Sequence, residues 1–249
     1  VLYPVKGAGL MNRMWLTAAL QRQYVFEKRS AANNLRDKVN EIYDSLKLIT
    51  DMYNHQLNGK WDHIMSLRQG VTASYYEKPK LDSIEVPVTG ELKIKTESAG
   101  VDDVANVLPV FSTLMDESHY IDLYNTGQRK IKWSATANVS WIKLSKTGGE
   151  LNEQDRIDVT IDKGSIPQNS NVKGVIEIKT DKGTSQVFVS AFAPALNIDS
   201  LKGISIEHNG VVSIPAADFQ RKKENGSIKM QIVKALGYEG KAVMMGSPV

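Results

Sequence analysis

Cysteine is absent from the chain, and histidine is scarce. The 249 residues include no cysteine and four histidines. Without cysteine there can be no disulfide, no cysteine-ligated zinc site and no thiol nucleophile. The histidines His55, His63, His119 and His208 lie in different predicted elements, and the turn signal Asn58-Gly59 separates the first two. We therefore expect solvated or hydrogen-bonded imidazoles and no metal site.

Long apolar runs and an excess of one charge are also missing. No apolar run approaches the roughly 18–20 residues that a membrane-spanning helix needs. The 31 basic and 28 acidic side chains nearly balance at a net charge of +3, which supplies no extended cationic field for nucleic acid. The hydrophobic fraction of 41% and the charged fraction of 24% are ordinary for a globular protein. We expect neither a membrane span nor a nucleic-acid partner.

The common catalytic motifs do not occur in the sequence. It contains no G-x-S-x-G elbow, no H-E-x-x-H, no P-loop and no G-x-G-x-x-G after a strand. Two carboxylate pairs, Asp102/Asp103 and Asp116/Glu117, lie in loop-like stretches. Adjacent acids point apart and lack the apolar burial that would separate their pKa values. We therefore expect no catalytic residue and no cofactor.

The first third of the chain is predicted to be helical. From about residue 5 to 28 apolar side chains leave little polar face, which is typical of a helix enclosed by neighbours. The following segment has one apolar stripe, formed by Leu35, Val39, Ile42, Leu46, Ile49 and Tyr53. This spacing predicts an antiparallel hairpin partner for the first helix.

Alternating patterns predict strands in the remainder. Runs such as YIDLYN, RKIKWSATA, RIDVTID, GVIEIKT and TSQVFVSAF place apolar residues at every second position and are joined by Asn, Asp and Gly turns. The expected fold class is α+β and multidomain. It comprises an antiparallel helical bundle at residues 1–70, a linker with short edge strands at 71–110 and an Ig-like antiparallel β-sandwich at 111–195. Residues 196–249 would be the start of a second β unit, an incomplete segment of a C-terminal sandwich.

Exposed aromatic rings are the sequence's candidates for ligand contacts, because sugar rings stack on them. Trp15 and Trp133 fall at apolar positions of predicted elements, and we expect both in the core. Trp61, Tyr75 and Tyr76 lie at the junction between the helical and β segments, and Trp141 lies in SWIKLSK. These four are the candidate carbohydrate-binding residues. The alternative for them is packing at a domain boundary.

Several strings together resemble glycoside hydrolase family 115, the xylan α-1,2-glucuronidases. In order they are VLYPVKGAGLMN, NGKWDHIMS, LPVFSTLMDESHYIDLYNTGQRKIKW, WIKLSKTGG, RIDVTID and GVVSIPAADF. The resemblance covers nearly the whole chain. It implies a portion downstream of the catalytic barrel, which agrees with our expectation that a sequence beginning at Val1 is cut from a longer protein.

The β segments have resemblances of their own. The sandwich is similar to Ig-like modules of carbohydrate-degrading proteins from Bacteroidetes. GVVSIPAADF resembles the opening strand of family 6 carbohydrate-binding modules, but Pro215-Ala216-Ala217 stands where those modules usually carry Glu-Ala-Glu. Calcium or polar binding at this segment is therefore not implied.

The family resemblance implies a non-catalytic role. The chain would act as scaffold, dimer contact and active-site rim for an α-glucuronidase, and would be inactive by itself. Its partners would be the catalytic barrel of the same enzyme, xylan or glucuronoxylan oligosaccharides and a second copy, in the periplasm or outside the cell. Two alternatives stay open: a carbohydrate-binding module, or a purely structural Ig-like module with a helical stalk.

Overall fold

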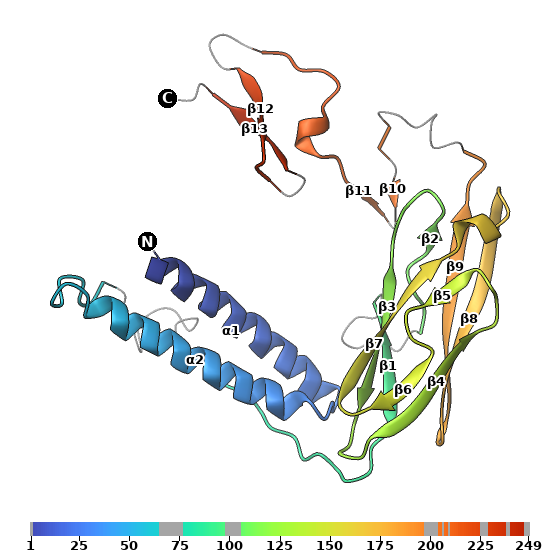
Figure 1. Ribbon diagram of the computed structural model, residues 1–249, viewed down its shortest axis with the longest axis horizontal. Helices are drawn as coiled ribbons and strands as arrows, with labels where there is room; N and C mark the ends of the chain where they lie inside the picture. The colour runs from blue at the N-terminus through green and yellow to red at the C-terminus, as the bar shows by residue number, and fades with distance from the viewer. Residues whose placement is uncertain are drawn as a thin grey trace. The chain divides into compact units, whose positions relative to one another are not determined.

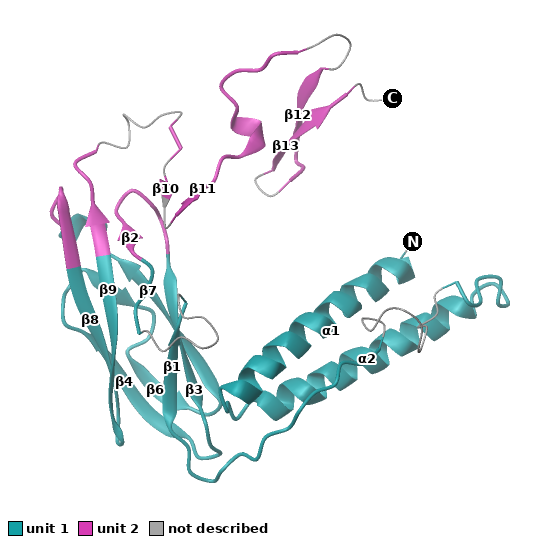
Figure 2. Cartoon of the chain, turned by 180° about the vertical axis from the view of Figure 1, so that it is seen from behind, with its two compact units in different colours: residues 1–109, 118–165, 173–190 teal, residues 110–117, 166–172, 191–249 magenta. Residues whose placement is uncertain are grey.

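The computed structural model describes residues 2–64, 77–97, 106–196, 204–205, 207–208, 210–224, 229–237 and 240–246. The chain divides into two compact units (Figure 2). The first comprises residues 1–109, 118–165 and 173–190, and the second comprises residues 110–117, 166–172 and 191–249. Within the described ranges, no helix combines the length and the apolar character that crossing a lipid bilayer requires.

Two long helices form an antiparallel hairpin at the beginning of the first unit (Figure 1). They are α1 (Leu2–Phe26) and α2 (Ala32–Asn54). Met14 and Ala18 of α1 pack against Val39 and Ile42 of α2, and all four are buried. The apolar stripe predicted for the second helix is thus its contact face. A larger bundle is not part of the described hairpin and stays a prediction.

The prediction that the first helix is enclosed is wrong for the described residues. One face of α1 packs on α2, but Leu2, Val5 and Leu16 on the opposite face are 60%, 64% and 72% exposed. Leu20 is also exposed, and Gly9 lies on the same face with open space around it. These five residues, called the α1 stripe below, recur at helical spacing on one side of the helix. Trp15, expected in the core, is half-buried against the hairpin core.

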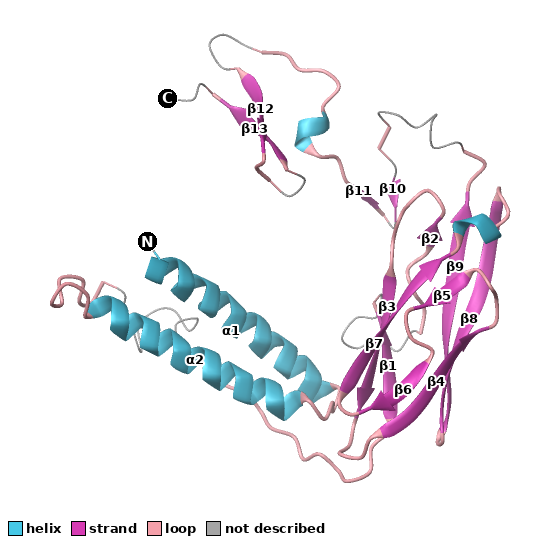
Figure 3. Ribbon diagram, in the orientation of Figure 1, coloured by secondary structure: helices cyan, strands magenta, loops and turns pink. Residues whose placement is uncertain are grey.

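The strands form the predicted mainly antiparallel β-sheets (Figure 3). The first sheet has the strand order β1 (Leu92–Thr96), β3 (His119–Asn125), β7 (Gln154–Ile161) and β5 (Ile142–Leu144). The second has the order β2 (Phe111–Ser112), β9 (Gly183–Ala193), β8 (Ser170–Thr180), β4 (Ile131–Ala137) and β6 (Gly148–Leu151). β2 runs parallel to β9, whereas the register of β1 on β3, β3 on β7 and β4 on β8 is antiparallel.

Alternate strand residues form the sandwich core, as the sequence pattern predicts. Its buried members include Ile121, Leu123, Trp133, Ile157, Val159, Ile176, Ile178, Val187 and Val189. Because successive strand residues point to opposite faces, the intervening positions point away from this core. Trp133 is 5% exposed, which confirms its expected place in the core. The Ig-like arrangement and the domain boundaries stay predictions.

A buried ionic cluster joins the hairpin to the first sheet within the first unit. Arg29, in the turn between the helices, is 2% exposed and is paired with Glu27. Its guanidinium carbon lies 4.4 Å from the ring centroid of Tyr24 and 4.2 Å from that of Tyr124. The cation therefore contacts one face of each of the two rings. Lys95 of β1 adds an ion pair to Glu27 at 2.5 Å. We call these five residues the junction cluster.

The junction cluster shifts the pKa values of its members. Burial alone would raise the pKa of the Glu27 carboxyl, but hydrogen bonds from Lys95, Gln23 and Arg29 outweigh that cost and hold the pKa below its ordinary 4.5. Burial raises the pKa of the phenols of Tyr24 and Tyr124. Glu27 is therefore a charged partner of Arg29 and Lys95 at neutral pH.

The second unit contains short hairpins. They are β10 (Glu207–His208) with β11 (Val211–Val212), and β12 (Met230–Lys234) with β13 (Lys241–Met245). A single 3-10 turn, η4 (Ala216–Asp218), falls in the GVVSIPAADF string. Among the side chains from residue 204 onward whose burial is described, none is buried. The incomplete β segment expected at residues 196–249 stays a prediction.

Candidate functional site

The structure places the predicted aromatic residues in separate environments. Trp61 is half-buried in the turns that follow α2, with the Lys60 ammonium 5.1 Å from its ring centroid. Trp141 directly precedes β5 and is only 7% exposed, so its ring offers little surface to a sugar. The end of α2 lies away from the sandwich (Figure 1), and the two tryptophans therefore do not form one platform. Tyr75 and Tyr76 lie outside the described residues, and carbohydrate binding by all four stays a prediction.

The carboxylate pairs give no indication of acid–base chemistry. Asp102 and Asp103 lie outside the described residues. The Glu117 carboxylate accepts a hydrogen bond from the Ser112 backbone N–H at 2.6 Å, which stabilises the loop before β3. Nowhere in the described ranges do three or more His, Asp or Glu side chains gather as a metal site would require.

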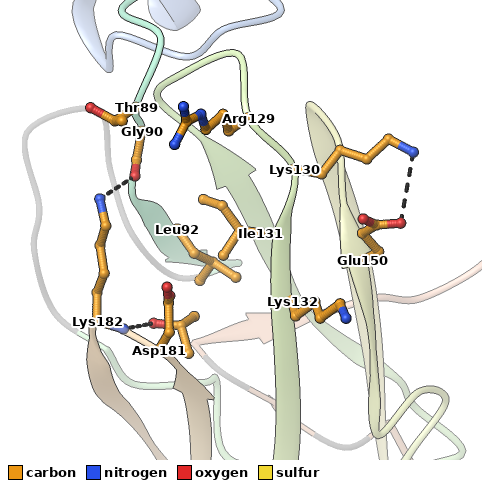
Figure 4. A pocket seen from close by; sticks show the side chains of 11 residues that line it. Thr89, Gly90, Leu92, Arg129, Lys130, Ile131, Lys132, Glu150, Asp181 and Lys182 are labelled. Atoms are coloured by element: carbon orange, nitrogen blue, oxygen red, sulfur yellow. Dashed lines mark hydrogen bonds and ion pairs between the residues drawn. The ribbon is translucent and has the colours of Figure 1, made fainter.

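A cavity at one end of the sandwich brings charged residues together from four parts of the first unit (Figure 4). Its volume is about 400 Å³, within the roughly 300–1,000 Å³ common for small-molecule sites. It is lined by Thr89, Gly90 and Leu92 around the start of β1, Arg129, Lys130, Ile131 and Lys132 before and in β4, Glu150 of β6, and Thr180, Asp181 and Lys182 of the β8–β9 turn. We call this the end cavity.

The end cavity has a positive rim and an apolar centre. Four cationic side chains face two carboxylates among its lining residues. Leu92 and Ile131 lie side by side between the charged groups (Figure 4). Two of the cations are engaged: Lys130 lies 3.7 Å from Glu150, and the Lys182 ammonium donates to the Gly90 carbonyl at 2.7 Å. Within the described ranges, neither Arg129 nor Lys132 has an ion-pair partner.

Asn125 organises the backbone on which Arg129 stands. Its buried amide donates to the carbonyls of Arg129 and Asn152, each at 2.8 Å, and accepts the Gly127 N–H at 2.8 Å. The Arg129 N–H also donates to the Val88 carbonyl at 3.1 Å. The turn between β3 and β4 is thus held on both sides.

Gly90 and Gly127 allow the two backbones that flank this turn to meet. A Cβ placed on Gly90 would lie 2.1 Å from the Gly127 nitrogen, and one on Gly127 would lie 2.3 Å from the Gly90 nitrogen. Side chains do not fit at either position without backbone movement. This close approach brings the start of β1 against the β3–β4 turn and so positions one wall of the end cavity.

Two other cavities are present in the first unit. One, of about 740 Å³, lies beside the junction cluster and is lined by both signs of charge, including the paired Lys93 and Glu91 at 2.8 Å. The other, of about 490 Å³, lies on the outer face of β8 and β9 beside Phe188, which is 51% exposed. Neither brings together two cations without an ion-pair partner among the described residues, as the end cavity does with Arg129 and Lys132 beside the carboxylate of Asp181.

The search for exposed aromatic rings overlooked the end cavity, although a cluster of cations in the sequence marks part of it. The string RKIK places three cations around Ile131 directly after a turn. The other lining residues Gly90 and Lys182 lie far from this string in the sequence, and only the strand pairing brings them to the same cavity.

The exposed ring of Phe188 could also have been predicted. In the alternating run TSQVFVSAF it occupies one of the positions that point away from the core.

Comparisons with known proteins match part of the chain. Residues 113–191, within the sandwich segment, match the family model described as "Viral BACON domain". No curated protein sequence matches the chain. The family match covers less than a third of the 249 residues, so it describes a segment and not the whole chain.

Several solved structures resemble the chain distantly. The GH5 xyloglucanase of Bacteroides ovatus, in complex with a XXXG heptasaccharide, is 12% identical at a TM-score of 0.30, over 41% of this chain and 19% of that one. The E. coli chaperone DraB is 12% identical at 0.33, over 47% and 62%. A family 123 glycoside hydrolase from Clostridium perfringens is 12% identical at 0.31, over 44% and 28%. The chain thus spans less than two thirds of each, and these matches identify neither a ligand nor glycoside hydrolase family 115.

Proposed function

We propose that the chain is a non-catalytic part of a carbohydrate-degrading enzyme of the xylan α-1,2-glucuronidase type. Its sandwich would carry the helical hairpin as one body, and the hairpin would pack against the catalytic barrel of the same enzyme. The enzyme would act in the periplasm or outside the cell. The ordered family 115 strings motivate the enzyme class.

The α1 stripe is the observation that carries the scaffold role. Leu2, Val5 and Leu16 are at least 60% exposed on a helix whose other face is already packed. An apolar helix face of this kind is stabilised when a partner covers it. The junction cluster buries Arg29 between hairpin and sheet, which would transmit a fixed orientation from the sandwich to such a partner.

The charges of α1 favour the catalytic barrel over a second copy of the chain as the partner that covers the α1 stripe. Between residues 2 and 26 the helix carries Lys6, Arg13 and Arg22 and no acidic residue. A second α1 placed alongside would oppose cations to cations, which is unfavourable. We therefore expect residues 1–249 not to dimerise through the α1 stripe. Size-exclusion chromatography with light scattering measures the oligomeric state of residues 1–249 and tests this expectation.

Activity measurements test the proposal. Residues 1–249 should release no glucuronic acid from glucuronoxylan, whereas the longer protein from the same reading frame should release it. Turnover by residues 1–249 would contradict the non-catalytic role, and an upstream reading frame without a barrel would contradict the enzyme class.

A pair of variants tests the role of the α1 stripe. Leu16→Glu should destabilise the longer protein while leaving the melting temperature of residues 1–249 nearly unchanged. The matched control is Leu48→Glu, because Leu48 is also 60% exposed but lies on α2. Equal effects of the two variants in the longer protein would remove the α1 stripe as the contact surface.

A second candidate function is carbohydrate binding, which the end cavity favours. Affinity electrophoresis of residues 1–249 in gels containing glucuronoxylan measures it directly. Retarded migration supports a binding module, and equal mobility with and without the polysaccharide removes it and leaves the structural role.

A further inference from the structure

We infer that the end cavity binds an acidic sugar residue, a hexuronate, through its carboxylate, with Arg129 as the main anchor. The inference rests on the cavity's own chemistry and does not depend on the enzyme class proposed above. It concerns none of the four aromatic residues that the sequence singles out.

Unpaired positive charge in a concave place points to an anionic ligand. Lys130 and Lys182 already have partners at 3.7 and 2.7 Å. Arg129 and Lys132 have no ion-pair partner among the residues the structure describes. A guanidinium presents parallel N–H donors that match the two oxygens of a carboxylate.

The other lining residues favour a sugar over a simple anion. Asp181 would repel an inorganic phosphate or sulfate, whereas its carboxylate oxygens accept hydrogen bonds from sugar hydroxyls. Thr89 adds a hydroxyl group at the rim, whereas the Thr180 hydroxyl already donates to the Gly183 carbonyl and accepts the Lys182 N–H within the turn. Leu92 and Ile131 provide an apolar surface between the charges, on which the C–H face of a pyranose ring can lie.

The lining also disfavours nucleic acid. No Trp, Tyr, Phe or His is among the lining residues, so the cavity lacks a ring on which a base would stack. A compact anion with many hydroxyl groups fits this lining better than a polyphosphate chain does.

The backbone of Arg129 is fixed before a ligand arrives. The buried Asn125 amide donates to its carbonyl, and its N–H donates to the Val88 carbonyl. The point from which the exposed side chain extends is thus set, which removes the backbone part of the entropy lost on binding.

A titration with two matched sugars tests the inference. Sodium D-glucuronate and D-glucose differ only in the oxidation of C6, so they separate carboxylate recognition from general sugar binding. Isotope-labelled residues 1–249 are titrated with each and followed by amide chemical shifts. Glucuronate should shift the signals of residues 89–92, 129–132 and 180–182 in a saturable manner, and glucose should bind at least about tenfold more weakly.

Variants locate the carboxylate contact. Arg129→Gln should weaken glucuronate binding by about tenfold or more, because one charge-assisted contact is lost. Arg129→Lys keeps the charge but loses the planar fork and should give an intermediate loss. Arg36→Gln removes an exposed arginine of α2 outside the cavity and should leave binding unchanged. The amide spectrum of each variant reports whether the fold is retained.

Other outcomes would overturn the inference. Saturable glucose binding of equal strength would remove the carboxylate as the recognised group. Inorganic phosphate, or a single-stranded oligonucleotide, that binds as tightly as glucuronate and is weakened by Arg129→Gln would replace the sugar with a general anion site. An unshifted spectrum with glucuronate would remove the site altogether. Equal mobility with and without glucuronoxylan, together with saturable binding of free glucuronate, would remove the polysaccharide-binding module proposed above and leave this inference intact.

Discussion

The junction cluster and the end cavity accommodate an arginine in opposite ways. At the junction, Arg29 is 2% exposed, pairs with Glu27 and lies between two tyrosine rings. In the end cavity, Arg129 is exposed and has no ion-pair partner among the described residues. A buried guanidinium needs every one of these contacts, because an uncompensated buried charge is costly. A guanidinium at the rim is solvated and keeps its donors available for a ligand.

One residue links the two regions. The Asn125 backbone carbonyl accepts the N–H of Ser30, which follows Arg29, at 2.8 Å, while its side chain orders the turn that carries Arg129. We therefore expect substitution of Arg29 at the junction to lower the free energy of unfolding most, and substitution of Asn125 to lower it less. Substitution of Arg129 should leave the free energy of unfolding almost unchanged while it weakens ligand binding.

The largest effect is expected for Arg29→Ala. It should lower the free energy of unfolding by about 3–5 kcal/mol, because Glu27 loses one of its buried cationic partners and both rings lose their cation contact. Chemical denaturation followed by circular dichroism measures it. Arg36→Ala, which removes an exposed pair with Asp37, should cost less than about 1 kcal/mol. A similar loss for both variants would contradict the structural role of the junction cluster.

Asn125→Ala is expected to cost about 2–4 kcal/mol. It leaves the Gly127 N–H and the carbonyls of Arg129 and Asn152 without their side-chain partner in a buried place. The same denaturation experiment applies. Asn34→Ala, which removes one exposed hydrogen bond to Glu153, is the control and should change stability by less than about 1 kcal/mol.

Acid should weaken the junction through Glu27. Its pKa in the folded protein lies below the ordinary 4.5, so its stabilising charge is fully present above about that pH and is lost as the pH falls through the lowered value. The stability difference between the wild type and Glu27→Gln should therefore shrink as the pH drops below 4.5. Denaturation curves between neutral and acid pH measure it. A constant difference between the wild type and Glu27→Gln across this range would argue against the depressed pKa.

The smallest stability effect is expected for Arg129→Gln. Since the side chain is exposed and has no ion pair in the described ranges, the free energy of unfolding should change by no more than about 0.5 kcal/mol. Its thermal melt should overlay that of the wild type, while glucuronate binding falls. A stability loss comparable to that of Asn125→Ala would mean that Arg129 serves the fold and not a ligand.

The sequence predicts those parts of the fold that depend on local periodicity. The stripe through Val39, Ile42 and Leu46 predicts the contact face of α2, and alternation predicts the buried positions of β3, β7 and β9. The first helix is different, because its apolar residues cover two faces and only one has a partner in the described chain. Periodicity reports how much apolar surface exists and not which neighbour covers it.

The junction and the end cavity could not be predicted, because both depend on residues far apart in sequence. Arg29 meets Tyr124, and Arg129 shares a cavity with Gly90 and Lys182, only through strand pairing and the helix turn. The burial of Trp141 could not be predicted either, because its local sequence suits a surface as well as a core. The indole is buried because it packs beside Gly174, a distant residue on which a Cβ would lie 3.3 Å from the indole.

The parallel pairing of β2 with β9 has a consequence for behaviour at high concentration. Residues 106–112 run along the outer edge of β9, where Leu108 donates to the Phe188 carbonyl at 3.0 Å and Phe188 donates to the Asn106 carbonyl at 2.8 Å. The opposite edge is the four-residue β6, and the first sheet ends in the three-residue β5. Long free strand edges are templates for polymerisation. The remaining edge of the first sheet is the five-residue β1. Because each uncovered edge is short, we expect the sandwich to resist growth into fibrils by strand addition, and we expect association at high concentration to proceed through the exposed leucines of α1.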